Sequence, residues 1–248
     1  MVNRLLLCGL PALALCLSCA ATAADAPASG VPGNIDQILA RCLADPEKQS
    51  TGGQDECIDD ATQAWDARLN VNYQSLRDTL PETARPALLA AQRAWLASRD
   101  ADLKLIAAVY ATVHGTMYAP ANANDVMLLT QRRAQTLARY RDCGEVSTAA
   151  SKDARLACAK TPGHAANAEV DRWGRRMMRR LPPASNNAVR TSNEKWRAFA
   201  VAESGLIAVV CPSEGHPNAQ ACRDGQASRE TTARVQWLKG LDAMIGAD

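Results

Sequence analysis

The chain has 248 residues and a formal net charge of +2, which is too small to indicate a nucleic-acid-binding protein. Hydrophobic residues make up 47% of the sequence, enough for a substantial core, but aromatic residues make up only 4%. An alanine-rich, aromatic-poor composition of this kind favours helices over sheets.

Residues 1–24 have the pattern of a secretory signal peptide. A basic residue, Arg4, precedes an apolar run to about Leu17, and small residues at 21–24 form a cleavage site. The run is too short to span a bilayer. A lipoprotein signal ending at Cys19 is the alternative, although Cys16 stands where such signals carry an aliphatic residue. We therefore expect a periplasmic or secreted protein.

A linker and a short helix, together residues 25–41, precede a duplicated segment. A constant offset of 101 residues relates unit 42–142 to unit 143–243, and identical residues recur at this offset along the whole unit. The offset carries Cys42 onto Cys143, Cys57 onto Cys158, Trp95 onto Trp196, Arg133 onto Arg234 and Leu137 onto Leu238. Solenoid repeats are only about 20–50 residues long, so this period indicates a duplicated domain. The units differ in charge, with 11 basic against 13 acidic residues in the first and 15 against 10 in the second.

Six cysteines lie beyond the signal peptide: Cys42, Cys57, Cys143, Cys158, Cys211 and Cys222. An even number in an exported chain indicates disulfides. The repeat favours the pairs Cys42–Cys57 and Cys143–Cys158, which leaves Cys211–Cys222. A metal site is the alternative, but these six cysteines include no C-x2-C pair and the three histidines are scattered. We expect no cofactor.

Apolar residues at helical spacing predict three helices in each unit. In the first unit they run from after Cys57 to Leu80, from near Glu82 to Val109 and from about Asp125 to Tyr140, with a loop at 114–124. In the second they cover about 165–180, 184–210 and, after a loop at 211–222, the segment to about Ile245. A short helix is expected over 35–44. The predicted fold is all-α, with two tandem helical bundles stapled by disulfides and with five tryptophans in the core.

Three motifs follow one another in the first unit. They contain Asp66, Leu69, Asn70 and Tyr73; then Gln92, Trp95, Arg99 and Asp100; then Thr130 and Arg133. Their order and spacing over residues 42–142 resemble the LprI-like lysozyme inhibitor family, and the second unit is a degenerate copy. The resemblance implies a helical, exported, non-catalytic protein that binds lysozyme.

The sequence suggests several contact regions for such a partner. The loop between Cys211 and Cys222 carries His216 near its tip and could plug the lysozyme cleft, which holds two catalytic carboxylates. The equivalent loop of the first unit carries His114 and Tyr118. Acidic residues such as Asp59 and Asp60 suit a basic partner.

The polar family residues Asn70, Gln92, Arg99 and Asp100 have two interpretations. They form either a binding surface or a hydrogen-bonded scaffold between helices, and the scaffold is favoured because buried amides need partners.

A different function is suggested by five arginines at helical spacing: Arg172, Arg175, Arg176, Arg179 and Arg180. They could form the basic face of a non-catalytic envelope adaptor that contacts anionic cell-wall or lipid surfaces, although a solvated face is the simpler interpretation. No catalytic motif is recognised, so we expect no enzyme. The sequence thus predicts a periplasmic lysozyme inhibitor that acts by stoichiometric occlusion, and it leaves the oligomeric state open.

Overall fold

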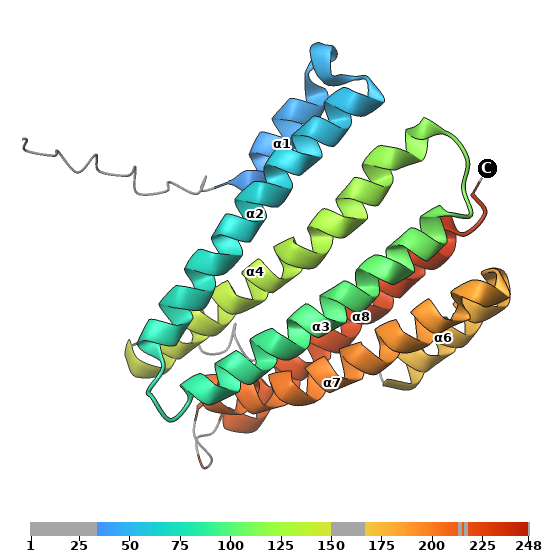
Figure 1. Cartoon of the computed structure of the whole chain (residues 1–248). Helices are drawn as coiled ribbons and strands as arrows, with labels where there is room; N and C mark the ends of the chain where they lie inside the picture. Colours follow the sequence, from blue (N-terminus) through green and yellow to red (C-terminus); the bar gives the residue numbers. More distant parts are fainter. Residues whose placement is uncertain (1–33, 150–166, 213–214, 216–217, 248) are drawn as a thin grey trace, which may run out of the picture. The chain divides into compact units, whose positions relative to one another are not determined.

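The computed structural model describes residues 34–149, 167–212, 215 and 218–247, and within these ranges it is helical without strands. This confirms the all-α class. The described residues belong to one compact unit. Its helices are α1 (Ile35–Ala44), α2 (Thr51–Thr79), α3 (Arg85–Tyr110), α4 (Ala119–Ala149), α6 (Asn167–Arg180), α7 (Asn186–Val210) and α8 (Ala219–Met244) (Figure 1). Three short 3-10 turns are η1 (Pro46–Lys48), η2 (Thr116–Tyr118) and η3 (Pro183–Ser185).

Helix boundaries in the two copies follow the sequence repeat. The 101-residue offset carries the last residue of α2, Thr79, onto the last residue of α6, Arg180. It also carries the first residue of α3, Arg85, onto the first residue of α7, Asn186. The repeated pattern in the sequence therefore corresponds to a repeated order of helices: α2, α3 and α4 in the first copy, and α6, α7 and α8 in the second.

Two helices of the first copy begin earlier than the periodicity predicts. Helix α2 begins at Thr51, because the Ser50 side chain accepts a hydrogen bond from the Gly53 backbone N–H at 3.1 Å and caps the first turn. A Cβ at Gly53 would lie 2.8 Å from the Lys48 Cα, so the close return of the chain from η1 requires glycine there. Helix α4 begins at Ala119 inside the predicted loop, since Pro120 occupies the first turn, where no intrahelical N–H bond is lost.

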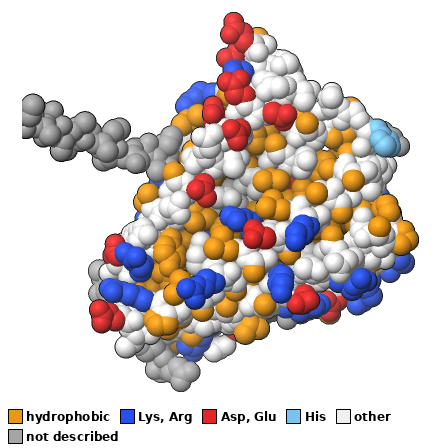
Figure 2. Space-filling view, viewed as in Figure 1, with side chains coloured by type: hydrophobic (Ala, Val, Ile, Leu, Met, Phe, Trp, Pro, Cys, Tyr) orange, Lys and Arg blue, Asp and Glu red, His pale blue; other side chains and the backbone are white. Residues whose placement is uncertain are grey.

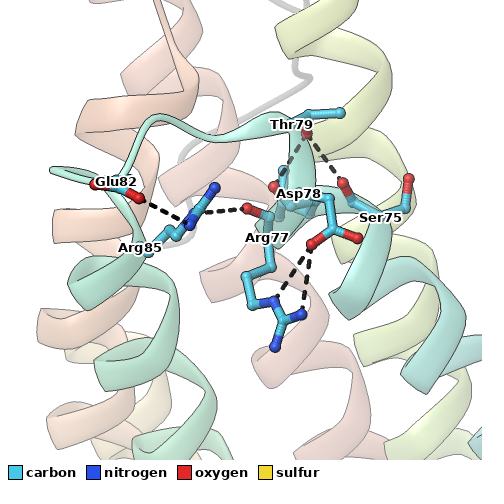
Figure 3. A network of polar contacts seen from close by, with 7 residues as sticks. Ser75, Arg77, Asp78, Thr79, Glu82 and Arg85 are labelled. Atoms are coloured by element: carbon cyan, nitrogen blue, oxygen red, sulfur yellow. Dashed lines mark hydrogen bonds and ion pairs between the residues drawn. The ribbon is translucent and has the colours of Figure 1, made fainter.

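The turn between α2 and α3 is fixed by local polar contacts (Figure 3). The Arg85 guanidinium, at the start of α3, donates to the Arg77 carbonyl at 3.1 Å and lies 3.7 Å from the Glu82 carboxylate. The Thr79 hydroxyl donates to the Ser75 carbonyl at 3.1 Å in the last turn of α2. These bonds satisfy carbonyl groups that the helix end leaves without intrahelical partners.

The two copies share one hydrophobic core. Helix α2 packs mainly on α4, whereas α3 packs mainly on α7 of the second copy (Figure 1). One continuous cluster of buried apolar residues runs through both copies. Four of the five tryptophans, Trp65, Trp95, Trp196 and Trp237, are buried in it, and Trp173 packs against it half-buried. The predicted core placement of the tryptophans is thereby confirmed.

Buried ion pairs also join the copies. Arg133 of α4 lies 2.8 Å from Glu203 of α7, and both side chains are 1% exposed. Arg234 of α8 lies 2.8 Å from Asp102 of α3. Each arginine thus pairs with an acid of the other copy, which compensates the cost of burying the charges.

Two of the three predicted disulfides are present. Cys42–Cys57 ties α1 to the second turn of α2, and Cys211–Cys222 ties the end of α7 to the start of α8. Cys158 and the side chain of Cys143 lie outside the described residues, so Cys143–Cys158 stays a prediction. The predicted signal peptide and residues 25–33 of the linker also lie outside them.

Candidate functional site

A groove of about 550 Å³ opens in the first copy between α2 and α3, over α4. Thr62, Gln63, Asp66, Ala67 and Asn70 of α2 line one side, Arg99 and Leu103 of α3 line the other, and Val126 and Thr130 come from α4. Four of these residues belong to the family motifs: Asp66, Asn70, Arg99 and Thr130. The fold therefore brings together, in one groove, residues from all three motifs.

The second copy closes the equivalent space. The offset carries Tyr73 onto Gly174, where a Cβ would clash with the Asn193 side-chain amide of α7. Because residue 174 has no side chain, α6 packs directly on α7, whereas α2 makes no comparable contact with α3. The helices that flank the groove in the first copy therefore correspond to helices in direct contact in the second.

Two of the motif residues are exposed on the rim of the groove. The Asn70 amide donates to the Asp66 carboxylate at 3.2 Å, one turn earlier on the same helix. Both side chains are otherwise open to solvent. Asn70 therefore joins no second helix, and the scaffold interpretation fails for it.

Arg99 combines two contacts on α3. Its guanidinium lies 3.0 Å from the exposed Asp100 carboxylate and 5.3 Å from the centre of the Trp95 ring. Both partners belong to its own helix. A half-buried arginine beside an exposed carboxylate gives this side of the groove both charges.

The remaining motif residues hold the helices together. The Gln92 side chain accepts from the Arg133 Nε at 3.1 Å, so the scaffold interpretation holds for Gln92. Leu69 and Trp95 are in the core, and Tyr73 is half-buried against it. The motifs therefore contain both structural residues and groove residues.

Sequence reasoning missed Asn72. This buried side chain donates to the Ala134 carbonyl at 2.8 Å and links α2 to α4. It lies two residues from Asn70, and only its place on the helical stripe beside Leu69 and Leu76 distinguishes it as the inward-facing amide.

The end of the first copy around the Cys42–Cys57 bridge is acidic. Between Asn34 and Asp66 the chain has eight acidic residues against two basic ones. Figure 2 shows acidic side chains gathered over α1, η1 and the start of α2. Asp59 and Asp60 are exposed there, and Asp59 accepts from the groove residue Gln63 at 2.9 Å. The acidic surface and the groove are therefore continuous.

The loop after α3 is held by the C-terminal tail. The Tyr118 hydroxyl donates to the Ala247 carbonyl, and the Gly246 N–H donates to the Thr112 hydroxyl at 3.0 Å. His114 is exposed, and Met117 is 74% exposed. The loop thus lacks a disulfide but is anchored beside its exposed tip by backbone contacts from the other end of the chain. His216 lies outside the described residues.

A half-buried tyrosine–carboxylate pair supports the base of the same loop. The Tyr110 hydroxyl donates to the Asp125 carboxylate at 2.8 Å. Burial is the main cause that raises the pKa of both groups above their usual values. The pair links the end of α3 to α4 and belongs to the support of the loop.

The five arginines of α6 are mostly paired. Arg176 and Arg180 each lie 2.7 Å from the buried Asp242 carboxylate, and Arg172 lies 2.5 Å from Glu169. Arg175 and Arg179 are exposed. All five arginines lie at the surface, but three of the five charges are partly neutralised by these ion pairs.

The described residues contain no group of three or more His, Cys, Asp or Glu side chains arranged to hold a metal ion. No helix among them is both long enough and apolar enough to cross a membrane.

Comparisons with known proteins agree with the motifs. Residues 42–137 match the model of the family described as "Lysozyme inhibitor LprI". A crystal structure of an uncharacterized protein from Burkholderia thailandensis is similar over 86% of this chain and 98% of that one, with 27% sequence identity and a TM-score of 0.64. No curated protein matches the chain. The family is one of non-catalytic lysozyme inhibitors. Inhibition of lysozyme suggests a location outside the cytoplasm for the family. Residues 42–137, within the first copy, are therefore similar to the LprI lysozyme-inhibitor family.

Proposed function

We propose that this chain is an exported, periplasmic lysozyme inhibitor that binds lysozyme stoichiometrically and occludes its substrate cleft. The observation that carries the proposal is the convergence of Asp66, Asn70, Arg99 and Thr130, from three motifs of the matched module, on one open groove. Residues needed only for packing would be buried, but Asp66 and Asn70 are exposed.

Charge supports the same face of the molecule. Lysozyme is a basic protein, and the acidic surface around Asp59 and Asp60 continues into the groove through Gln63. Opposite charges on two partners accelerate association and fix their orientation. The Cys42–Cys57 bridge ties down this end, so less conformational entropy is lost on binding.

The loop at His114 provides a second contact in this proposal. Its exposed tip carries His114 and Met117, and its base is fixed by Tyr118 and the C-terminal tail. A pre-organised projection is suited to enter a cleft, because its ordering cost is already met on folding.

A turbidity assay tests the proposal. Purified mature protein is mixed with a c-type lysozyme and bacterial cell walls, and the rate of clearing is followed. We expect clearing to slow at a near-equimolar ratio and the inhibition to weaken as salt is raised, because salt screens the charge contacts. Unchanged clearing at a tenfold excess of the protein would reject the proposal.

Variants locate the surface. We expect Asp59→Lys with Asp60→Lys to weaken inhibition about tenfold or more, equivalent to about 1.4 kcal/mol or more of binding free energy. Glu194→Lys, an equally exposed charge reversal on α7, is the matched control and should inhibit normally.

A second comparison concerns the groove. Asn70→Ala should weaken inhibition and leave the thermal midpoint unchanged, since the side chain is exposed. Asn187→Ala, an exposed asparagine on α7, is its control. Equal inhibition by both asparagine variants would exclude Asn70 from the surface.

The envelope-adaptor alternative has less support. Only Arg175 and Arg179 of the five arginines remain exposed without an ion pair in the structure. Two exposed charges give weak attraction to an anionic surface, worth about 1 kcal/mol each.

A further inference from the structure

A second pocket, of about 300 Å³, lies between the two copies and shares Arg99 with the groove of the first copy. Its walls come from α3, α4, α7 and α8. Six arginines line it against two acids: Arg99, Arg132, Arg133, Arg139, Arg229 and Arg234 against Asp102 and Glu230. Even when Glu203, the partner of Arg133, is included, positive charge is in excess.

Several of these guanidinium groups have buried N–H groups without a hydrogen-bond partner in the structure. The Nη2 atoms of Arg132 and Arg133 and the Nε atoms of Arg139 and Arg234 are shielded from solvent and have no hydrogen-bond partner in the structure. Arg133 is only 2% exposed as a residue. A buried donor without a partner costs free energy, and a charged donor costs more. An anion in the pocket would supply the missing acceptors.

Aromatic side chains form another part of the lining. Trp95, Trp196, Phe199 and Trp237 line the pocket. The Trp237 ring lies 4.5 Å from the Arg234 guanidinium and 5.8 Å from that of Arg132. An inorganic anion would use the arginines and leave the rings without a contact. A flat or apolar body that carries an acidic group would use both, and pockets for small molecules begin at about 300 Å³.

We infer that this pocket binds a small organic carboxylate with an aromatic or apolar body. The carboxylate accepts hydrogen bonds from the arginine N–H groups, and the body packs on the tryptophan rings. Burial lowers the pKa of Arg132, and a bound anion offsets this by favouring the charged guanidinium. The site is formed by residues of both copies.

Calorimetric titration of the full mature chain tests this inference. The probes are 1-naphthylacetate, its uncharged analogue 1-naphthylacetamide, and sulfate, all at low ionic strength. We expect the carboxylate to bind at a ratio of one per chain and at least about tenfold more tightly than the amide or sulfate. No binding of the carboxylate at millimolar concentration, equal binding of the amide, or equal binding of sulfate would each overturn the inference.

Substitutions assign the binding to this pocket. Arg139→Gln changes a side chain that is 37% exposed, so the fold should tolerate it. Arg132→Gln changes a guanidinium that lies 5.8 Å from the Trp237 ring. We expect both to weaken 1-naphthylacetate binding about tenfold or more. Arg93→Gln, an exposed arginine of α3 that does not line the pocket, is the control and should bind normally. Normal binding by a folded Arg139→Gln protein would overturn the inference.

Discussion

Arg133 and Glu203 belong to different copies of the repeat, and their side chains meet 2.8 Å apart in the core. The 101-residue offset carries Arg133 onto Arg234 and Glu203 back onto Asp102, which form the second buried pair, also at 2.8 Å. Gln92 and Asn193 are likewise equivalent, and each accepts a hydrogen bond from the arginine of its own copy. The copies are therefore related by a pseudo-twofold arrangement, in which the arginine of each copy pairs with the acidic residue of the other.

The exchanged ion pairs should contribute strongly to stability. Replacing Glu203 by Gln leaves the buried Arg133 charge without its partner, which costs about 3–5 kcal/mol in the free energy of unfolding. Urea denaturation measures this loss. The double variant Arg133→Met with Glu203→Leu removes both charges and should recover much of it.

The exposed pair Lys195–Glu194 provides a control for that experiment. Glu194→Gln should change stability by less than about 1 kcal/mol, because exposed pairs contribute little. A Glu203→Gln loss as small as that of the control would show that the buried pair is not important for the fold.

The first copy should not fold as a monomer on its own. In the full chain α3 is covered by α7, and a fragment of residues 25–142 would expose that apolar face. Because α3 and α7 are equivalent, two fragments can pair through α3, with Arg133 of one facing Asp102 of the other. We expect light scattering after gel filtration to give a dimer. A stable, cooperatively folding monomer would contradict this expectation.

Two helical glycines should respond to alanine in opposite directions. A Cβ at Gly174 would clash with the Asn193 amide, so Gly174→Ala should lower the free energy of unfolding by about 1–3 kcal/mol. Nothing lies within 4 Å of a Cβ at Gly205 on the exposed side of α7, so Gly205→Ala should raise it by about 0.5–1 kcal/mol. Thermal or urea denaturation distinguishes the two. An equal effect at both positions would argue against the close packing of α6 on α7.

Glu230 should make stability depend on pH. Burial, together with the negative charge of Glu203, raises the pKa of Glu230 above its ordinary value of 4.5. The folded protein therefore holds this proton more tightly than the unfolded chain, so stability falls as pH rises from about 4.5 through the raised pKa.

Glu230→Gln removes this effect. The stability of the variant relative to the unmodified protein should increase between pH 4.5 and pH 7.5, measured by urea denaturation at each pH. A difference that stays constant over this interval would show that Glu230 titrates as in the unfolded chain.

The sequence predicted those features that depend on local information. Apolar periodicity predicted the helices, and cysteine spacing within the repeat predicted Cys42–Cys57 and Cys211–Cys222. The motif residues were found by their spacing along the chain. Helix starts were less accurate, because the cap at Ser50 and the first-turn Pro120 lie outside the apolar stripe.

The sequence could not show which face of each helix finds which partner. Asn70 and Asn72 are the same residue type two positions apart, yet one lines the groove and the other links α2 to α4. Their roles differ because successive helical residues point in different directions, and only the position of α4 decides which of them is buried.

By itself, the sequence determined an all-α chain with two copies of one helical module, of which the first carries the LprI motifs. It could do so because helical apolar spacing and the cysteine positions follow directly from the order of residues along the chain. Tertiary structure alone decided that α3 pairs with α7, that Arg133 meets Glu203 across the copies, and that a groove stays open beside α2. The physical reason is that these features bring together residues far apart in the chain, 70 positions for Arg133 and Glu203. Their choice depends on the shape and charge of surfaces that exist only once the helices have formed.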